Sequence, residues 1–390
     1  MPKLSFIITV AMLSTFGLLA SDIYLPAMPE MTHTFGIADW QMSQTISVYL
    51  FMLATAQLFY GPLSERFGRK PVLIVGIALY MLGSLGCALT DSYSAFLVCR
   101  IVEASGAAAG LVIGRTLIAD TCDKRTSAKV YSVVYPLVSL SPALAPAIGG
   151  HLVAAFGWRA DFIFVAIFGL MTLGMVLFLP ETRPKTAPRL TSPFSGFSQV
   201  MADPHFRRYA LIVCAIYCAW FVYLTQSPFL FARQGLSEEQ SGWLYVPLTC
   251  GIILANLVTR KLLDRWPYDR IVTVGILFFV AGGLGYAVLA ALNVAGIASV
   301  IIPMCLVSLA NGSSLSLAVS GAISSKHNNA ATASGLIGFL QMGSAAWVAT
   351  GISAEFGVSA KVLGISILVL GLIALSASIT WTRRQAPEVI

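Results

Sequence analysis

The sequence predicts an all-α integral membrane protein with twelve transmembrane helices in two pseudo-symmetric six-helix bundles. Three observations predict this fold class. Apolar runs of roughly 20 residues, the length that a bilayer core requires, recur along the whole chain. Of the 24 Lys and Arg residues, 20 fall in alternate connections between these runs. Only 11% of the 390 residues are charged, too few to cover the surface of a soluble protein of this size.

The twelve expected spans are separated by short polar connections, which is the pattern of consecutive membrane crossings. They lie near residues 4–28, 42–63, 71–90, 94–116, 130–155, 160–180, 207–231, 242–262, 271–292, 296–322, 331–354 and 358–381.

The basic residues predict the orientation of these spans. Counted by alternate connections, one set holds 20 and the other holds three (Arg159, Arg233 and Lys361), while Arg100 lies inside the fourth span. Short loops rich in Lys and Arg stay in the cytoplasm, so both termini should be cytoplasmic. We expect a multi-pass protein of the bacterial inner membrane. The net charge of +7 then comes from the excess of basic residues in the cytoplasmic loops, which face anionic lipid headgroups. It does not indicate a nucleic-acid partner.

The longest polar connection divides the chain into two halves. From Glu181 to Arg208 it holds four prolines and five basic residues, which indicates a cytoplasmic linker. We therefore expect an N-terminal bundle over 1–180, a linker over 181–206 and a C-terminal bundle over 207–390. The halves echo one another at an offset near 200, as Leu63–Phe67 and Leu262–Trp266 show. Transporters commonly bind substrate near mid-membrane between two such repeats.

An ordered motif of glycines and charges separates the second and third spans. From Gly61 to Pro71 it reads Gly-Pro-Leu-Ser-Glu-Arg-Phe-Gly-Arg-Lys-Pro. A loop whose basic residues only set the membrane topology would need positive charge, but it would not need these residues in this order. The order resembles motif A of the major facilitator superfamily, with Glu in place of the usual Asp. The resemblance implies a cytoplasmic latch in which Arg69 pairs with Asp120. The latch residues are Gly61, Glu65, Arg66, Gly68, Arg69 and Asp120.

Further motifs narrow this resemblance. The fifth span is similar to the antiporter motif of the same superfamily at Pro142, Pro146, Gly149 and Gly150. Stretches around Asp22 on the first span and Gln226 on the seventh resemble the Bcr/CflA bicyclomycin-resistance group of drug:proton antiporters. Parts of the fifth and tenth spans are also similar to a purine-nucleoside transporter of that group. The resemblance covers essentially the whole chain.

Three charged residues stand out because they lie several residues inside expected spans, where insertion of a charge costs roughly 2.5–3.5 kcal/mol. They are Asp22, Arg100 and Glu103. Asp22 and Arg100 should lie at matched depth, since each is about six residues from the outer end of its span, so we expect them to pair. Glu103 lies one turn deeper than Arg100 on the same helix face. A buried carboxyl that water reaches alternately from each side of the membrane could carry protons. Arg100 would then hold the two carboxyls in position and tune their pKa values. A static buried ion pair is the alternative.

Polar and aromatic residues at mid-span are the candidates for substrate binding. A mostly apolar pocket with few polar groups suits amphipathic or aromatic solutes. For each aromatic residue, an interfacial position against lipid is the alternative. The candidates are Tyr24, Tyr49, Tyr135, Tyr217, Trp220, Tyr223, Gln226, Asn256, Asn311 and Gln341.

The sequence therefore predicts a proton-coupled secondary transporter, most consistent with multidrug efflux by alternating access. The alternative is a proton-linked transporter of a defined metabolite such as a purine nucleoside. No paired nucleophile and base, metal-ligand cluster or Walker-type phosphate loop occurs in the sequence, so we expect neither an enzyme nor an ATP-driven pump. We expect a monomer with no cofactor and no metal, driven by the proton gradient.

Overall fold

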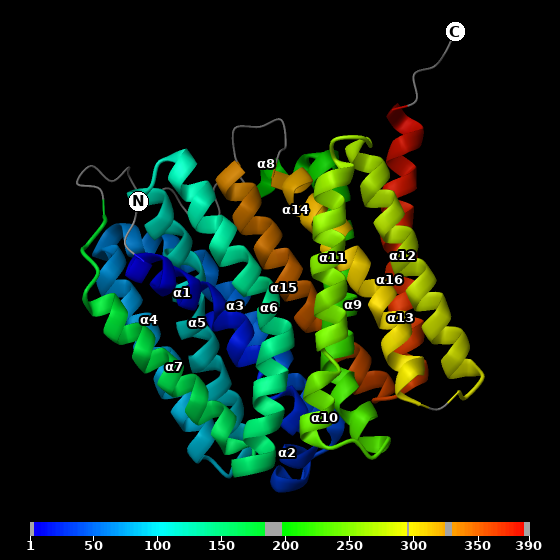
Figure 1. Cartoon of the computed structure of the whole chain (residues 1–390), viewed down its shortest axis with the longest axis horizontal. Coiled ribbons are helices and arrows are strands. Elements are labelled where there is room, and N and C mark those ends of the chain that lie inside the picture. Colours follow the sequence, from blue (N-terminus) through cyan, green and yellow to red (C-terminus); the bar gives the residue numbers. More distant parts are fainter. Residues whose placement is uncertain (1–3, 184–196, 295, 324–329, 386–390) are drawn as a thin grey trace. The chain divides into compact units, whose positions relative to one another are not determined.

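The computed structural model describes residues 4–183, 197–294, 296–323 and 330–385, which are helical almost throughout. Eleven helical stretches among these residues are long and apolar enough to cross a membrane. The helix α6 (Lys124–Phe156) contains a further apolar stretch, Leu140–Phe156. The all-helical membrane fold predicted from the sequence is confirmed (Figure 1). Helices prevail because lipid offers no hydrogen-bond partner to a backbone amide, so each span must satisfy its own.

The chain divides into two compact units, residues 1–193 with 237–245, and residues 194–236 with 246–390. The first, here unit 1, contains α1 (Leu4–Asp22), η1 (Leu25–Ala27), α2 (Met28–Phe35), α3 (Asp39–Phe67), α4 (Arg69–Leu89), α5 (Tyr93–Thr121), α6, α7 (Arg159–Leu177) and α10 (Glu238–Trp243). The second, unit 2, contains α8 (Phe197–Ala202), α9 (Pro204–Arg233), α11 (Val246–Leu262), α12 (Tyr268–Ala291), α13 (Ile297–Ala310), η2 (Asn311–Leu315), α14 (Ser316–Ile323), α15 (Ala330–Phe356) and α16 (Ala360–Gln385).

The short helix α10 departs from the expected division at residue 207, because it clusters with unit 1 and packs on α6. Two glycines allow this contact. A Cβ on Gly150 would lie 2.5 Å from the carbonyl oxygen of Glu238, and one on Gly242 would lie 2.3 Å from that of Pro146. Only hydrogen in place of Cβ lets the two backbones approach this closely.

The first span is longer than the sequence predicts and is interrupted. It was expected to end near residue 28, but α1 stops at Asp22, a single 3₁₀ turn follows, and α2 continues to Phe35. Pro26 and Pro29 lack the N–H that an α-helix interior needs, so this stretch loses two bonds of the regular helical ladder at the point where the helix is interrupted. The interruption places Asp22 and Tyr24 at the end of a helical segment, where backbone carbonyls lack intrahelical partners.

The tenth span is also interrupted, by the π-helical turn η2 at Asn311–Leu315 between α13 and α14. Such turns are rare within α-helices and frequently occur at functional sites.

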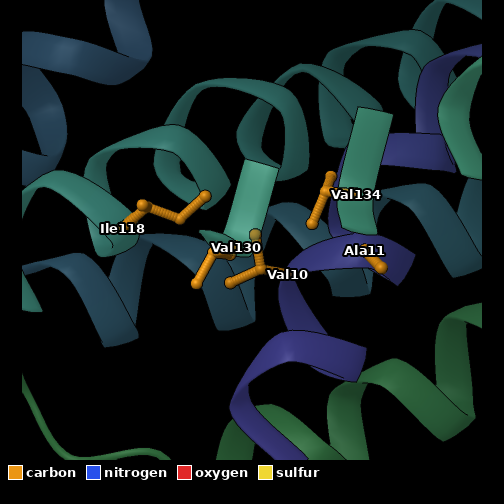
Figure 2. Close-up of a cluster of buried hydrophobic side chains, with 5 residues drawn as sticks. All are labelled: Val10, Ala11, Ile118, Val130 and Val134. Carbon is orange, nitrogen blue, oxygen red and sulfur yellow. The ribbon is translucent and has the colours of Figure 1, made fainter. Parts of the chain in front are cut away.

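Small residues and branched apolar side chains hold unit 1 together. A Cβ on Gly106 of α5 would lie 2.2 Å from the backbone N of Tyr80 on α4, so the backbones of these two helices are in direct contact at this glycine. Elsewhere α1, α5 and α6 share an apolar cluster made of Val10, Ala11, Ile118, Val130 and Val134 (Figure 2). These contacts fix the helices that carry the buried charges.

Candidate functional site

An ion pair lies fully buried inside unit 1. Arg100 and Glu103 occupy adjacent turns of α5, and the Arg100 Nη1 donates to Glu103 Oε2 at 2.5 Å. The other carboxylate oxygen of Glu103 accepts from Ser84 Oγ on α4, also at 2.5 Å. Gly83 makes this possible, because a Cβ there would lie only 2.4 Å from the backbone N of Glu103. Close packing of α4 against α5 thus supplies the second donor to the carboxylate.

Aromatic rings surround the Arg100 guanidinium. Its Cζ lies 4.1 Å from the ring centroid of Tyr49, 4.7 Å from that of Tyr24 and 5.9 Å from that of Phe162. Cation–π attraction is strongest when the cation is desolvated, as it is here. Arg100 Nη1 also donates to the carbonyl of Ala20 at 3.1 Å, in the last turn of α1. The interruption of the first span leaves that carbonyl available.

Asp22, the last residue of α1, is 2% exposed. Its carboxylate accepts a hydrogen bond from Ser21 Oγ at 2.6 Å. The expected direct pair with Arg100 is wrong, since the one ion pair that Arg100 forms within 4.0 Å among the described residues is with Glu103. Glu103 is the nearer partner of Arg100 because the two lie one turn apart on one helix, while Asp22 lies on another helix, at the end of α1. The two residues still interact electrostatically.

The two tyrosines beside Arg100 differ in their hydrogen bonding. Tyr24 and Thr45 share a hydrogen bond of 2.8 Å, and since Thr45 Oγ1 donates to the Met42 carbonyl, the Tyr24 hydroxyl is the donor. The hydroxyl of Tyr49 is buried and has no hydrogen-bond partner among the described residues. An unpaired buried hydroxyl next to a buried charge is a place where a ligand or water can bind.

Asp161, in the first turn of α7, is a third fully buried carboxyl of unit 1 within the described residues. Neither of its oxygens has a hydrogen-bond partner there. Glu30 of α2 is near enough to interact with it electrostatically. Sequence reasoning does not single out Asp161, because acidic residues are common in the first turn of a helix and usually face solvent there.

The antiporter motif of α6 packs against Ile23, the residue that follows Asp22. Pro142 and Pro146 lie one turn apart on α6, and Gly149 and Gly150 follow them. A Cβ on Gly149 would lie 1.8 Å from the carbonyl oxygen of Ile23, the residue after Asp22. The motif therefore sets how closely α6 approaches the interrupted part of the first span.

We predict that Gly149→Ala destabilises the protein by about 1–3 kcal/mol, because backbone must move to admit the methyl group. Transport should fall with it, since the shift displaces Asp22. Gly174→Ala in α7 is the matched control: its Cβ would meet nothing within 4 Å, so stability should be unchanged or slightly higher. Thermal unfolding of the purified variants measures both. Equal melting temperatures for the two variants would contradict the close approach.

The motif A residues lie at the end of unit 1 where α3 meets α4. Arg69 is buried, and its Nε lies 3.1 Å from Asp120 Oδ2 of α5 while its Nη1 donates to Ser64 Oγ at 2.7 Å. Gly68 has φ +100, a conformation that side-chain-bearing residues rarely adopt, and it forms the turn. A Cβ on Gly61 would meet no atom within 4 Å, so a close approach of another backbone does not explain why glycine occupies this position. Glu65 and Arg66 lie in the last turn of α3.

Glu181, just after α7, caps the same end of unit 1. Its carboxylate accepts backbone N–H bonds from Arg69 at 2.9 Å and Lys70 at 3.1 Å, the first residues of α4. It also accepts from the N–H groups of Thr182 and Arg183. Burial raises the pKa of Glu181, but these four donors outweigh it and hold the pKa below its usual value. The sequence motif omits Glu181 because its partners are 111 and 112 residues away.

We predict that Glu181→Gln lowers the free energy of unfolding at pH 7 by about 1 kcal/mol or less, because a charge-assisted helix cap is lost at an exposed site. The pKa of Glu181 is lower in the folded than in the unfolded state, so its stabilisation is complete above the ordinary value of 4.5. It disappears as the pH falls through the lower folded pKa. Wild-type and variant melting temperatures should therefore converge in acid; a constant difference would contradict the cap.

In unit 2, four of the candidate substrate residues share one helix. Tyr217, Trp220, Tyr223 and Gln226 recur every third residue along α9, and all are buried. The side-chain amide of Gln226 has no hydrogen-bond partner for either its N or its O among the described residues. A buried amide with two free donors and a free acceptor can orient a polar ligand.

The remaining candidates are more dispersed. Asn256 on α11 donates to the Ile252 carbonyl and accepts from Ser316 Oγ at 3.2 Å, so its amide is partly engaged. Asn311 begins the π-helical turn η2, and Gln341 is half-buried on α15. Tyr135 belongs to α6, and its side chain lies outside the described residues.

Among the described residues, no group of three His, Cys, Asp or Glu side chains is arranged to hold a metal ion.

Comparison with known proteins agrees with this architecture. The sequence profile of the Major Facilitator Superfamily matches residues 6–349. A chloramphenicol resistance protein of Pseudomonas aeruginosa is 31% identical over 336 residues, 82% of this chain and 78% of its own length. Multidrug resistance protein MdtL of Klebsiella pneumoniae (strain 342) is 30% identical over 353 residues, 89% of this chain and 88% of its own. The crystal structure of a D-xylose-proton symporter superposes with a TM-score of 0.75 at 16% identity, covering 95% of this chain and 97% of that one.

Proposed function

The chain belongs to the major facilitator superfamily and is a multi-pass membrane transporter rather than an enzyme, and from its buried charges we propose that it exchanges protons for drugs or other amphipathic solutes. In this proposal it is an antiporter of the Bcr/CflA group in the bacterial inner membrane. Both termini are cytoplasmic, the transmembrane proton gradient drives transport by alternating access, and no cofactor takes part.

The observation that carries proton coupling is the group of Asp22, Arg100 and Glu103 within unit 1. Two carboxyls and one guanidinium are kept fully or almost fully buried there, and such residues in a membrane bundle are functional by default. Arg100 cannot lose its proton, so a carboxyl must be the carrier. Among the described residues Asp22 has a single hydrogen-bond donor, Ser21, whereas Glu103 has two donors. Asp22 is therefore the freer of the two to change protonation.

The relatives support the choice of substrate class. Two of them, at 31% and 30% identity over most of the chain, carry names that refer to chloramphenicol resistance and multidrug resistance. The aromatic face of α9 and the two tyrosines beside Arg100 suit flat or amphipathic molecules, which bind by stacking and a few hydrogen bonds. The free amide of Gln226 also suits a purine base, so a nucleoside is the alternative substrate.

The test is transport into proteoliposomes with an imposed pH gradient. Chloramphenicol, ethidium and purine nucleosides are offered in parallel, and substrate flux is recorded together with proton flux by a trapped pH indicator. We expect chloramphenicol and ethidium to move only with the gradient, each with opposite proton movement. Uptake of a nucleoside alone would replace drug exchange with metabolite transport. Flux that needs ATP and no gradient would exclude secondary transport.

A further inference from the structure

A groove on unit 2 runs between α11, α12 and α13. Its volume is about 220 Å³, and no residue that lines it is charged. Thr259 and Ser313 are the hydroxyl-bearing residues of its wall, and the rest of the wall is apolar or glycine. The principal apolar side chains are Leu254, Val258, Trp266, Val274, Phe278 and Leu309.

The wall of the groove is exposed at the surface of helices that are long and apolar enough to span the membrane. Leu254 is 58% exposed, Val258 46% and Phe278 43%, although all three belong to membrane-spanning helices. Apolar side chains left exposed within a span lie against lipid, since nothing in a bilayer core drives them inward. A flexible hydrocarbon chain is the chemical complement of such a wall.

One end of the groove meets the basic turn between α11 and α12. Trp266 lies at this end, and the guanidinium carbon of Arg270 lies 4.6 Å from the centroid of its ring. Tryptophan at the end of a span marks the level of the lipid headgroups. Four basic side chains are exposed on this stretch: Arg260, Lys261, Arg265 and Arg270.

The acidic residues of this turn do not neutralise it. Asp269 is engaged from α9, since Arg208 Nη1 lies 3.0 Å from Asp269 Oδ1 and the Tyr209 hydroxyl donates to the same oxygen at 2.8 Å. Asp264 remains as an exposed carboxylate. The exposed charge beside the groove is therefore positive, and it complements a phosphate.

We propose that this groove is a binding site for one anionic phospholipid, with an acyl chain against α11 and α12 and the headgroup phosphate on Arg265 and Arg270. Basic pockets beside spanning helices bind anionic headgroups in this way. A zwitterionic lipid would fill the apolar wall equally well but gain nothing from the excess positive charge. A hydrophobic cargo molecule would not need the basic end.

The test is native mass spectrometry of the full chain, purified in detergent and titrated with phosphatidylglycerol or phosphatidylcholine carrying the same acyl chains. We expect the wild type to retain phosphatidylglycerol preferentially. A basic side chain near the headgroups contributes about fivefold in affinity, so the double variant Arg265→Gln with Arg270→Gln should weaken phosphatidylglycerol binding by roughly 30-fold. Arg115→Gln with Arg207→Gln, which removes two exposed basic side chains outside the groove, should leave binding unchanged.

A second variant tests the acyl-chain half of the site. Val274→Phe fills the groove and should weaken long-chain phosphatidylglycerol, while short-chain phosphatidylglycerol, which uses the headgroup contacts alone, binds both proteins alike. Equal retention of the two lipids by the wild type would overturn the proposal, as would equal effects of the two double variants. Because the lipid comparison uses the wild type, it remains decisive even if a variant does not fold.

Discussion

Asp22→Asn should abolish substrate-driven proton movement, to the level of liposomes without protein, while the protein still folds and inserts. Asparagine matches the shape of a protonated aspartic acid but cannot release a proton. Its side-chain oxygen can still accept from Ser21 Oγ, which is the hydrogen bond that holds Asp22 now. The buried end of α1 should therefore keep its packing and lose only its titration.

The measurement is proton release from proteoliposomes on addition of chloramphenicol, with substrate binding recorded separately. Asp91→Asn is the matched control, since it also removes a carboxylate from unit 1 but at an exposed pair with Arg159 that contributes about 1 kcal/mol or less. It should transport normally. Asp22→Glu, which restores a carboxyl, should recover part of the coupling. Normal proton movement in Asp22→Asn would remove Asp22 from the mechanism and leave Glu103 as the carrier.

The bilayer explains why so much of the fold could be predicted from the sequence. A span must be apolar over a fixed length and must form its own hydrogen bonds, so hydropathy alone locates most helices. The interruptions could not be predicted, because each depends on what packs against it. Pro26 and Pro29 are visible in the sequence, but proline is tolerated in many spans. Whether it ends a helix depends on partners such as Arg100, which takes up the freed carbonyl of Ala20.

The candidate site shows the same limit. Charge inside an apolar run is a local signal, and it identifies Asp22, Arg100 and Glu103 as buried residues. The choice of partner is a tertiary property, and Ser84 reaches Glu103 only because Gly83 brings α4 close to α5. Asp161 was missed since its burial depends on the elements packed around the start of α7, which the sequence of one helix does not reveal.

Arg100→Leu should cost about 3–5 kcal/mol of stability, because it leaves the Glu103 carboxylate buried without its counter-ion. Arg100→Lys should not restore the wild-type state, since an ammonium cannot lie flat over the rings of Tyr24 and Tyr49 as a guanidinium does. Thermal unfolding of the purified variants measures the loss.

The double variant Arg100→Leu with Glu103→Leu separates structure from function. Replacing both members of a buried ion pair by apolar residues is often neutral or stabilising, by as much as about 1–4 kcal/mol, so most of the lost stability should return. Coupled transport should not return, because Asp22 would then lose the positive charge with which it interacts. A double variant that is stable and still exchanges protons for substrate would make the pair a static ion pair of α5, which serves only to hold α5 against α1 and α4 through Ala20 and Ser84. A double variant as unstable as Arg100→Leu would mean that the aromatic rings around the guanidinium, and not the ion pair, hold this part of the bundle together.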